Sequence, residues 1–452
     1  MFDVNTATIL IGCMLLLVVM GVQIAIALGI TSALGIYLVT GSLQVVQAMV
    51  ASTATEALRD FTFAVIPLFM LMGEFIGTSG AITDIYQAIN RGLRRIPGRL
   101  AIATVLGNAA FSFVTGVSIA SAAAFSRIAY PEMRAFGYRK GFALGTIAGS
   151  SCLGMLIPPS VLMIVWGILT ERSIGQLFLA GVLPGLLLTI LFIGYVLTVA
   201  VLRPEVVGDE RPGLPARTGI GAEISPILDA RPASLAATLI STLGILAIVV
   251  GVLGGIWFGF FTPTEGAGAG AVMALLLALI KGVRGRGVVH AILTVGRTSA
   301  PILLLLLAAA LYSRTLAMTG VTNAVHDFFL ATGLPPELIL ACMVVVWFIL
   351  GMIIDSISIM LLTVPIFEPL AVQLGYDPLG FAIVGILAIE AGLLTPPFGL
   401  LVYTVKAAIQ DDTVSIVEIF KSSIPYWVIM LTAVVVIAYV PQIATYLPGL
   451  LF

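Results

Sequence analysis

The chain has 452 residues, of which 60% are hydrophobic and only 10% are charged, and its mean hydropathy is +1.17. So little charge cannot cover the surface of a soluble protein of this length, and the net charge of −1 excludes a basic nucleic-acid-binding protein. The composition therefore predicts a polytopic α-helical protein embedded in a lipid bilayer, with no nucleic acid as a partner.

The first distinctive element is the apolar stretch Ala101–Ser126, which is basic at both ends. Four arginines precede it and four basic residues follow it, so both ends are expected on the cytoplasmic side. A run of this length with both ends on one side predicts a re-entrant hairpin of two half-helices. Its tip would lie in the small, polar sequence FSFVTGVSIAS. Two ordinary spans with a misleading charge count are the alternative.

A long apolar segment follows this hairpin and is interrupted by Gly154 and by the pair Pro158–Pro159. Two successive prolines remove two backbone donors and break a helix. Within a bilayer the freed groups need partners, and a broken helix offers its carbonyls to cations and its amides to anions. The break therefore predicts an ion or substrate site. A proline kink without a ligand is the alternative.

The sequence after the first half, Arg203–Pro232, is rich in proline, glycine and charge, and it predicts a cytoplasmic linker. Farther along, Glu265 follows Pro263 in the sequence TPTEGAGAG. A carboxylate at this place is expected to cap the N-terminus of a helix.

The second candidate hairpin lies at Leu338–Phe367, and its acidic flanks without lysine or arginine are expected on the external side. A second break follows it. Shifting the sequence by 238 residues places Ser118 on Ser356, Gly154 on Gly392, and Pro158–Pro159 on Pro396–Pro397. Internal repeats of this kind are typical of secondary transporters. The predicted fold class is an all-α polytopic membrane protein with inverted repeats, two re-entrant helical hairpins and two broken helices.

The polar groups at the tips and breaks are oxygen donors, which suit a group-one or group-two cation and not zinc or copper. Asp355 is an intramembrane carboxylate and hence a functional candidate, with capping of local amides as its alternative role. Glu390, one turn before the second break, is left open between site and scaffold. The other candidates are Ser112, Thr115, Gly116, Ser118 and Ser121 at the first tip, Ser356 and Ser358 at the second, and Thr395 in the second break.

Four longer sequences carry a resemblance to a known family. They are LGMLIPPSVLMIVWGILTERSIGQLFLAGVLPGLLL (Leu153–Leu188), GGIWFGFFTPTEGAGAGAV (Gly254–Val272), GMIIDSISIMLLTVPIFEPLAVQLGYDP (Gly351–Pro378) and EAGLLTPPFGLLVYTVK (Glu390–Lys406). Over nearly its whole length the chain resembles the large membrane subunit of tripartite ATP-independent periplasmic (TRAP) transporters. Val117 stands where the family often has a serine, which affects the details of the first site but not its location.

The resemblance implies an elevator-type sodium symporter that imports organic acids across the bacterial inner membrane. A periplasmic binding protein would deliver the substrate, and a small four-helix membrane subunit would stabilise the scaffold. One sodium site would use Gly116, Ser118 and the backbone near Gly154 and Pro158. The other would use Asp355, Ser356 and the backbone near Gly392, Thr395 and Pro397. The substrate carboxylate would lie between the tips, near Thr115, Ser121 and Ser358.

The resulting domain organisation has a transport-domain part and a scaffold part in each half. We expect scaffold helices at 1–100 and 234–337, transport-domain halves at 101–176 and 338–414, a connecting helix at 177–202, the linker at 203–233, and a C-terminal membrane helix at 415–452.

Other functions are disfavoured. The sequence GTSG at 77–80 imitates the serine motif of intramembrane proteases, but such an enzyme needs a histidine on a neighbouring membrane helix, and His290 and His326 lie at predicted helix ends. No nucleotide-binding loop is present, so an ion gradient is the expected driving force. Matched breaks suit alternating access better than an open channel. The remaining alternative is a stand-alone sodium–dicarboxylate symporter without partner subunits.

Overall fold

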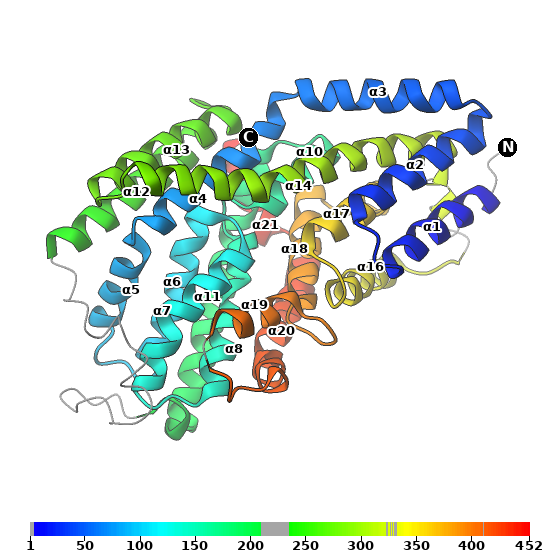
Figure 1. Cartoon of the computed structure of the whole chain (residues 1–452). Helices are drawn as coiled ribbons and strands as arrows, with labels where there is room; N and C mark the ends of the chain where they lie inside the picture. Colours follow the sequence, from blue (N-terminus) through cyan, green and yellow to red (C-terminus); the bar gives the residue numbers. More distant parts are fainter. Residues whose placement is uncertain are drawn as a thin grey trace.

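The computed structural model describes residues 4–208 and 235–452, apart from positions 322, 323, 326, 328, 330, 331 and 410. This part of the chain consists of helices joined by turns and contains no strand (Figure 1). Eight of its helical stretches are long and apolar enough to cross a membrane. The predicted all-α membrane architecture is therefore confirmed for these residues.

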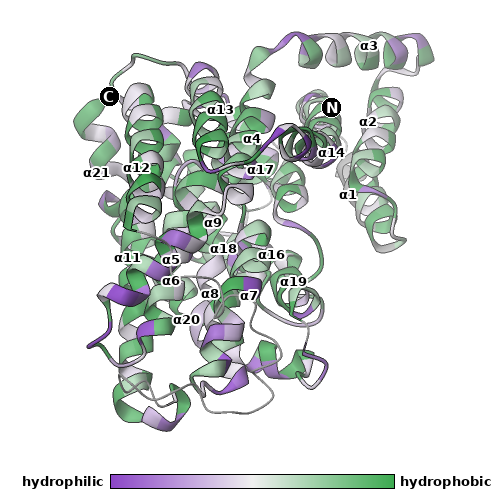
Figure 2. Ribbon diagram, turned by 60° about the vertical axis from the view of Figure 1, so that its left-hand side comes forward, coloured by the Kyte–Doolittle hydropathy of each residue, from purple (hydrophilic) through white to green (hydrophobic). Residues whose placement is uncertain are grey.

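Hydrophobic residues predominate along most helices (Figure 2), and many large hydrophobic side chains are exposed on the outside of the molecule. On α12 (Leu235–Trp257), the side chains of Leu239, Leu243, Leu246 and Val250 are 50–61% exposed. Their spacing of three to four residues places them on one stripe of the helix. A continuous apolar stripe of this kind is stable against lipid and unfavourable against water.

Outer helices of the two halves pack on one another. Helix α2 (Ile24–Thr40) packs along α14 (Gly285–Thr319), and α4 (Val65–Thr78) packs along α13 (Pro263–Ile280). Helix α3 (Leu43–Arg59) runs along one edge of the molecule, where it contacts α2 and α14 (Figure 1). The remaining outer helices are α1 (Val4–Val19) and α5 (Ala81–Gly92).

The capping predicted for Glu265 is confirmed at the start of α13. The Thr262 backbone N–H donates to Glu265 Oε2 at 2.9 Å, and the Glu265 backbone N–H donates to Thr262 Oγ1 at 3.3 Å. These two bonds form a capping box, which satisfies amides that a helix N-terminus otherwise leaves unpaired.

Each half contains an antiparallel helical hairpin. The first consists of α6 (Arg99–Thr115) and α7 (Ser118–Ala135), with only Gly116 and Val117 between them. The second consists of α16 (Pro336–Gly351) and α17 (Ser356–Gln373). Helix α17 begins and ends 238 residues after α7, so the repeat found in the sequence is also present in the helix boundaries.

Both hairpins are longer than the sequence indicated. The arms of the first contain 17 and 18 residues, which corresponds to about 25 Å each. The hairpin therefore covers residues 99–135 instead of 101–126, and the second covers 336–373 instead of 338–367. The difference arises because basic residues mark the membrane surface but do not end a helix, so Arg99 and Arg134 are themselves helical.

Both predicted helix breaks are confirmed. Helices α8 (Lys140–Ser151) and α9 (Leu153–Leu156) are separated from α10 (Val161–Thr170) by the segment that holds Pro158–Pro159. Helix α18 (Pro378–Gly392) is separated from α19 (Leu400–Ala408) by the segment that holds Pro396–Pro397. Both Pro–Pro bonds are cis.

The broken helices run through the centre of the protein. In an apolar 18-residue window of the stretch Lys140–Thr170, 89% of the residues are buried, whereas the corresponding windows of the other seven candidate spans are 28–61% buried. Non-helical backbone at membrane depth is tolerated where protein surrounds it, because protein groups can then satisfy the freed carbonyls and amides. Because Lys140–Thr170 is so deeply buried, protein surrounds the non-helical backbone of the first break.

The other helices of the described part are α11 (Ile174–Leu202), α20 (Ile416–Tyr439), α21 (Gln442–Leu451) and the short 3-10 helices η1 (Phe61–Ala64) and η2 (Pro204–Val206). The sequence predicted one C-terminal membrane helix at 415–452. The structure shows two helices there, because the chain leaves the helical conformation at Val440 before Pro441. Most of the predicted linker 203–233 lies outside the described residues, which end at 208 on this side.

Candidate ion and substrate site

The tip of the first hairpin packs directly into the first helix break. The backbone N–H of Val161, just beyond the prolines, donates to the Gly116 carbonyl at 3.1 Å. Gly116 has a φ of +61°, and a Cβ on it would lie 2.3 Å from the carbonyl oxygen of Pro159. Glycine adopts this positive φ readily and has no Cβ that would collide with Pro159, so no other residue suits this position. Gly116 and the proline pair are thus brought together.

Gly154 is the second contact between this tip and the break. A Cβ on Gly154 would lie 2.9 Å from the backbone nitrogen of Ser118, the first residue of α7. The absence of a side chain lets the N-terminus of α7 approach the first turn of α9. The predicted first-site residues Gly116, Ser118, Gly154 and Pro158 therefore lie at one place in the fold.

The hydroxyls at the first tip have different roles. Thr115 Oγ1 donates to the carbonyl of Phe111 at 3.0 Å, and Ser121 Oγ donates to Asn108 Oδ1 at 2.5 Å. Both hydroxyls are therefore engaged in bonds that hold the hairpin itself. The Ser118 hydroxyl, by contrast, is fully buried and has no hydrogen-bond partner among the described residues. Ser112 donates to the Asn108 carbonyl at 2.6 Å.

Asn108 is a polar residue of this site that sequence reasoning missed. It is fully buried on α6, and its Nδ2 donates to Ser150 Oγ on the broken helix at 2.6 Å. Together with the bond from Ser121, this contact joins both hairpin arms to α8. The available signal was a lone asparagine within an otherwise apolar run, at a position with no polar counterpart in the second repeat.

The second tip repeats the same arrangement. The Phe398 backbone N–H, just beyond the second proline pair, donates to the Met352 carbonyl at 3.1 Å. Gly351 and Gly392 pack backbone to backbone, because a Cβ on Gly392 would lie 2.7 Å from the Cα of Gly351. In this break, Thr395 Oγ1 donates to the Gly392 carbonyl at 2.6 Å.

Asp355 is the N-cap of α17, which was the alternative role considered for it. Its Oδ1 accepts from the Ser358 backbone N–H at 3.0 Å, and its Oδ2 accepts from Ser358 Oγ at 2.5 Å. The Ser358 hydroxyl is thus directed to the cap. Each carboxylate oxygen has further acceptor capacity, so capping does not exclude a role as an ion ligand.

The two broken helices meet in the interior, beside the second tip. Ser356 Oγ at the start of α17 donates to Glu390 Oε1 at 2.7 Å. Glu390 and Cys152 occupy equivalent positions in the two repeats, and Cys152 Sγ lies 3.8 Å from the Glu390 carbonyl oxygen. The Glu390 carboxyl also interacts with Ser118, so Glu390 lies between residues of both predicted sites.

Each hairpin packs on the broken helix of the opposite half. Helix α7 of the first half packs on α19 of the second, and α17 of the second packs on α10 of the first. Two polar contacts lie at the outer ends of these interfaces. Arg172, just beyond α10, donates from Nε and NH2 to Glu368 Oε1 on α17 at 2.9 and 2.6 Å.

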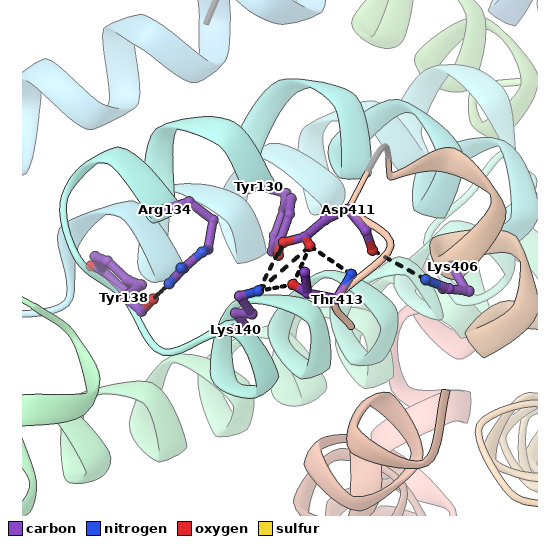
Figure 3. Close-up of polar contacts among 7 residues, drawn as sticks. All are labelled: Tyr130, Arg134, Tyr138, Lys140, Lys406, Asp411 and Thr413. Atoms are coloured by element: carbon purple, nitrogen blue, oxygen red, sulfur yellow. Dashed lines mark hydrogen bonds and ion pairs between the residues drawn. The ribbon is translucent and has the colours of Figure 1, made fainter. Parts of the chain in front are cut away.

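The other polar contact is the Asp411 cluster, formed by Tyr130, Lys140, Asp411 and Thr413 (Figure 3). Tyr130 Oη on α7 donates to Asp411 Oδ2 at 2.8 Å, and Lys140 Nζ lies 3.2 Å from the same oxygen. Lys406 at the end of α19 donates to the Asp411 main-chain carbonyl at 3.1 Å. The cluster ties α7 and α8 to the loop after α19.

The electrostatics of this loop favour the charged form of Asp411. Burial alone would raise the pKa of its carboxyl, but hydrogen bonds from Thr413, Tyr130 and Lys140 outweigh that effect and hold the pKa well below its ordinary value. Asp411 is therefore ionised at neutral pH and able to bind Lys140.

Comparisons with known proteins agree with this architecture. The sequence profile described as "Tripartite ATP-independent periplasmic transporter, DctM component" matches residues 11–443. The C4-dicarboxylate TRAP transporter large permease protein DctM of Pseudomonas aeruginosa is 31% identical over 396 residues, which cover 87% of this chain and 88% of that protein. The ectoine TRAP transporter large permease protein TeaC of Halomonas elongata is 26% identical and covers 98% and 99%.

A solved structure shares the fold. The YdaH transporter of Alcanivorax borkumensis superposes with a TM-score of 0.65 at 14% identity, over 91% of this chain and 90% of that one. The chain is thus a multi-pass membrane transport protein and not an enzyme. It belongs to the DctM family, the large membrane components of tripartite ATP-independent periplasmic transporters.

Proposed function

We propose that this chain is the translocation subunit of a sodium-coupled transporter that imports small organic acids across the bacterial inner membrane by an elevator mechanism. The observation that carries the proposal is the insertion of each hairpin tip into a helix break. Gly116 meets Val161 in one half, and Met352 meets Phe398 in the other. Such breaks supply backbone carbonyls and helix termini for ions at the midplane.

Two sodium ions would bind where the tips and breaks meet. The first would use Gly116, Ser118 and the backbone near Gly154 and Pro158, and the second would use Asp355, Ser356 and the backbone near Gly392, Thr395 and Pro397. The free hydroxyl of Ser118 and the remaining acceptor capacity of Asp355 support these assignments. Oxygen ligands of this kind suit sodium as the transported ion.

The substrate carboxylate would bind between the two tips. Helices α7 and α17 both begin there, and the N-terminus of a helix favours an anion. The relatives are named for C4-dicarboxylates and for ectoine, and we infer a small organic acid here. Because Thr115, Ser121 and Ser358 are engaged in local bonds, they would shape the substrate site more than coordinate its cargo.

The moving body in this proposal consists of the two re-entrant hairpins and the two broken helices. The exchange of packing partners between the halves supports movement as one unit, because α7 is held by α19 and α17 by α10. A small four-helix membrane subunit would bind the outer helices, and a periplasmic binding protein would deliver the substrate. A stand-alone symporter without these partners is the alternative.

Reconstitution in proteoliposomes tests the proposal. Uptake of a labelled C4-dicarboxylate should require an inward sodium gradient, the matching binding protein and the small subunit. Uptake that persists when potassium replaces sodium would contradict sodium coupling. Uptake that needs neither partner would favour the stand-alone symporter.

A further inference from the structure

The carboxyl of Glu390 is a buried group to which the two sodium sites give no role. Its side chain lies on α18 and is 1% exposed. Oε1 accepts a hydrogen bond from Ser356 Oγ at 2.7 Å, whereas Oε2 has no hydrogen-bond partner among the described residues. A carboxylate oxygen buried without a partner is costly, so this atom calls for a ligand.

The carboxyl of Glu390 is also associated with the first tip. Besides Ser356, the side chain that interacts with its carboxyl is Ser118 on α7. The Ser118 hydroxyl is itself fully buried and has no hydrogen-bond partner in the described part of the chain. Ser118 Oγ and the Glu390 carboxyl, from opposite halves, are therefore neighbours that interact without a hydrogen bond of normal geometry.

The repeat explains why one carboxyl reaches both tips. Glu390 is equivalent to Cys152, and Cys152 Sγ lies 3.8 Å from the Glu390 carbonyl oxygen, so these positions lie where the halves meet. A side chain at this place contacts the tip of its own half through Ser356, and its carboxyl also interacts with Ser118 at the tip of the opposite half.

Charge balance gives a second, independent argument. The second site contains Asp355, but the first site, as assigned from sequence, contains only glycine, proline and a serine hydroxyl. A buried cation needs a counter-charge nearby. Glu390, conversely, takes part in none of the ion pairs among the described residues, which involve Asp411, Glu368, Asp84 and Glu56. A cation beside Ser118 would give Glu390 a partner of opposite charge, and the Glu390 carboxylate would supply the counter-charge that the first site lacks.

We propose that Glu390 Oε2 is a ligand of the first sodium ion, together with Ser118 Oγ. This inference rests on the proposed function and adds to it, because the first sodium site is then built from both halves. Glu390 also contacts Ser356, a ligand of the second site, so a single side chain links the two ions.

Sodium binding to the purified protein tests this assignment without measuring transport. The thermal stability of the protein in detergent is followed as sodium chloride replaces choline chloride at constant ionic strength and at one pH. Glu390→Gln keeps the shape of the side chain and its bond with Ser356 but removes the charge. We expect it to raise the half-saturating sodium concentration by about tenfold or more.

Glu265→Gln is the matched control. Glu265 is exposed at the start of α13, and glutamine at this position retains the capping box, so its sodium response should equal that of the wild type. Glu390→Asp is a second test variant, because it keeps the charge but withdraws the carboxyl by one methylene. It should also weaken sodium binding, and the double variant with Ser118→Ala should be less than additive if both side chains bind one ion.

The outcomes separate this inference from the function on which it rests. If the wild type shows no stabilisation by sodium, sodium coupling itself is wrong. If the wild type responds, but Glu390→Gln and Glu390→Asp respond at the same sodium concentration, only the assignment of Glu390 is overturned. If Glu390→Gln does not fold, Glu390→Asp decides the question in the same assay.

Discussion

Tyr130 and Glu368 occupy equivalent positions on α7 and α17, and each bonds to a residue in the loop just after the other half's broken helix. Tyr130 donates to Asp411, whereas Glu368 accepts from Arg172. The hairpin residue is thus the hydrogen-bond donor in the first repeat and the acceptor in the second, although both contacts lie at the same place in their repeats. Together these contacts fasten each hairpin to the opposite half at its outer end.

The Arg172–Glu368 pair should stabilise this exchange of partners. Glu368 is largely buried, so removal of the arginine leaves a carboxylate without its counter-charge. We predict that Arg172→Met lowers stability by about 1–3 kcal/mol and reduces uptake, whereas Arg286→Met, an exposed arginine at the start of α14, has little effect. Thermal unfolding in detergent measures the difference. Equal melting temperatures for the two variants would contradict the prediction.

The Asp411 cluster should be insensitive to pH in the physiological range. Because the folded-state pKa of Asp411 lies below its unfolded value, its contribution is complete above the unfolded pKa and is lost as pH falls through the folded one. The difference in melting temperature between wild type and Asp411→Asn should be constant above about pH 5 and shrink only below about pH 4. Asp412→Asn, at an exposed neighbouring carboxylate, is the control. A difference that declines between neutral pH and pH 6 would argue against this account.

The glycines at the first tip should tolerate no side chain. Gly116→Ala places a Cβ against the Pro159 carbonyl, and Gly154→Ala places one against the start of α7. Both should abolish most sodium-dependent uptake, because the tip cannot then enter the break. Gly194→Ala on α11, where a Cβ meets nothing within 4 Å, should leave uptake unchanged. Normal uptake by either tip variant would show that the close approach is unnecessary for transport.

Two substitutions separate the capping role of Asp355 from its proposed role as an ion ligand. Asparagine is as good an N-cap as aspartate, so Asp355→Asn retains the cap and loses the charge, whereas Asp355→Ala loses both. We predict that both variants lose sodium-dependent uptake and that only the alanine variant also loses stability, by about 1 kcal/mol. Wild-type uptake by Asp355→Asn, at limiting and saturating sodium, would remove Asp355 from the ion site.

Accessibility of introduced cysteines tests the opposite orientation of the hairpins. After replacement of the three native cysteines, Arg95→Cys and Arg139→Cys at the exposed base of the first hairpin should react with an impermeant thiol reagent only from the cytoplasm. Glu337→Cys and Gln373→Cys at the base of the second should react only from the periplasm. Reaction of one hairpin's two positions from opposite sides would turn that hairpin into a pair of ordinary spans.

Most of the central architecture could be predicted from the sequence because it depends on local rules. The proline pairs cannot continue a helix, Gly116 turns the chain between two arms, and the register of the repeat placed equivalent residues without any structural information. The lengths of the two hairpins were less well predicted. The hairpins extend beyond their apolar parts because Arg99 and Arg134 continue the helices past the expected surface.

Contacts between the halves could not be predicted in the same way. The bond from Tyr130 to Asp411 joins residues 281 positions apart, and neither residue belongs to a recognisable motif. The roles of Asn108 and Glu390 depend on which tip faces which break, which is a property of tertiary packing. The sequence identified Ser118 and Ser356 as separate candidates, and only the structure shows that Glu390 lies between them.

The exchange of partners also has a consequence for biosynthesis. When α7 leaves the ribosome, its packing partner α19 has not been synthesised. Another 281 residues separate Tyr130 from its partner Asp411. Contacts so distant in sequence form slowly and leave apolar surface uncovered in the meantime. The face of α7 that contacts α19 therefore stays covered by lipid or by the insertion machinery until nearly the whole polypeptide has been made, whereas its contacts with α6 and α8 can form early.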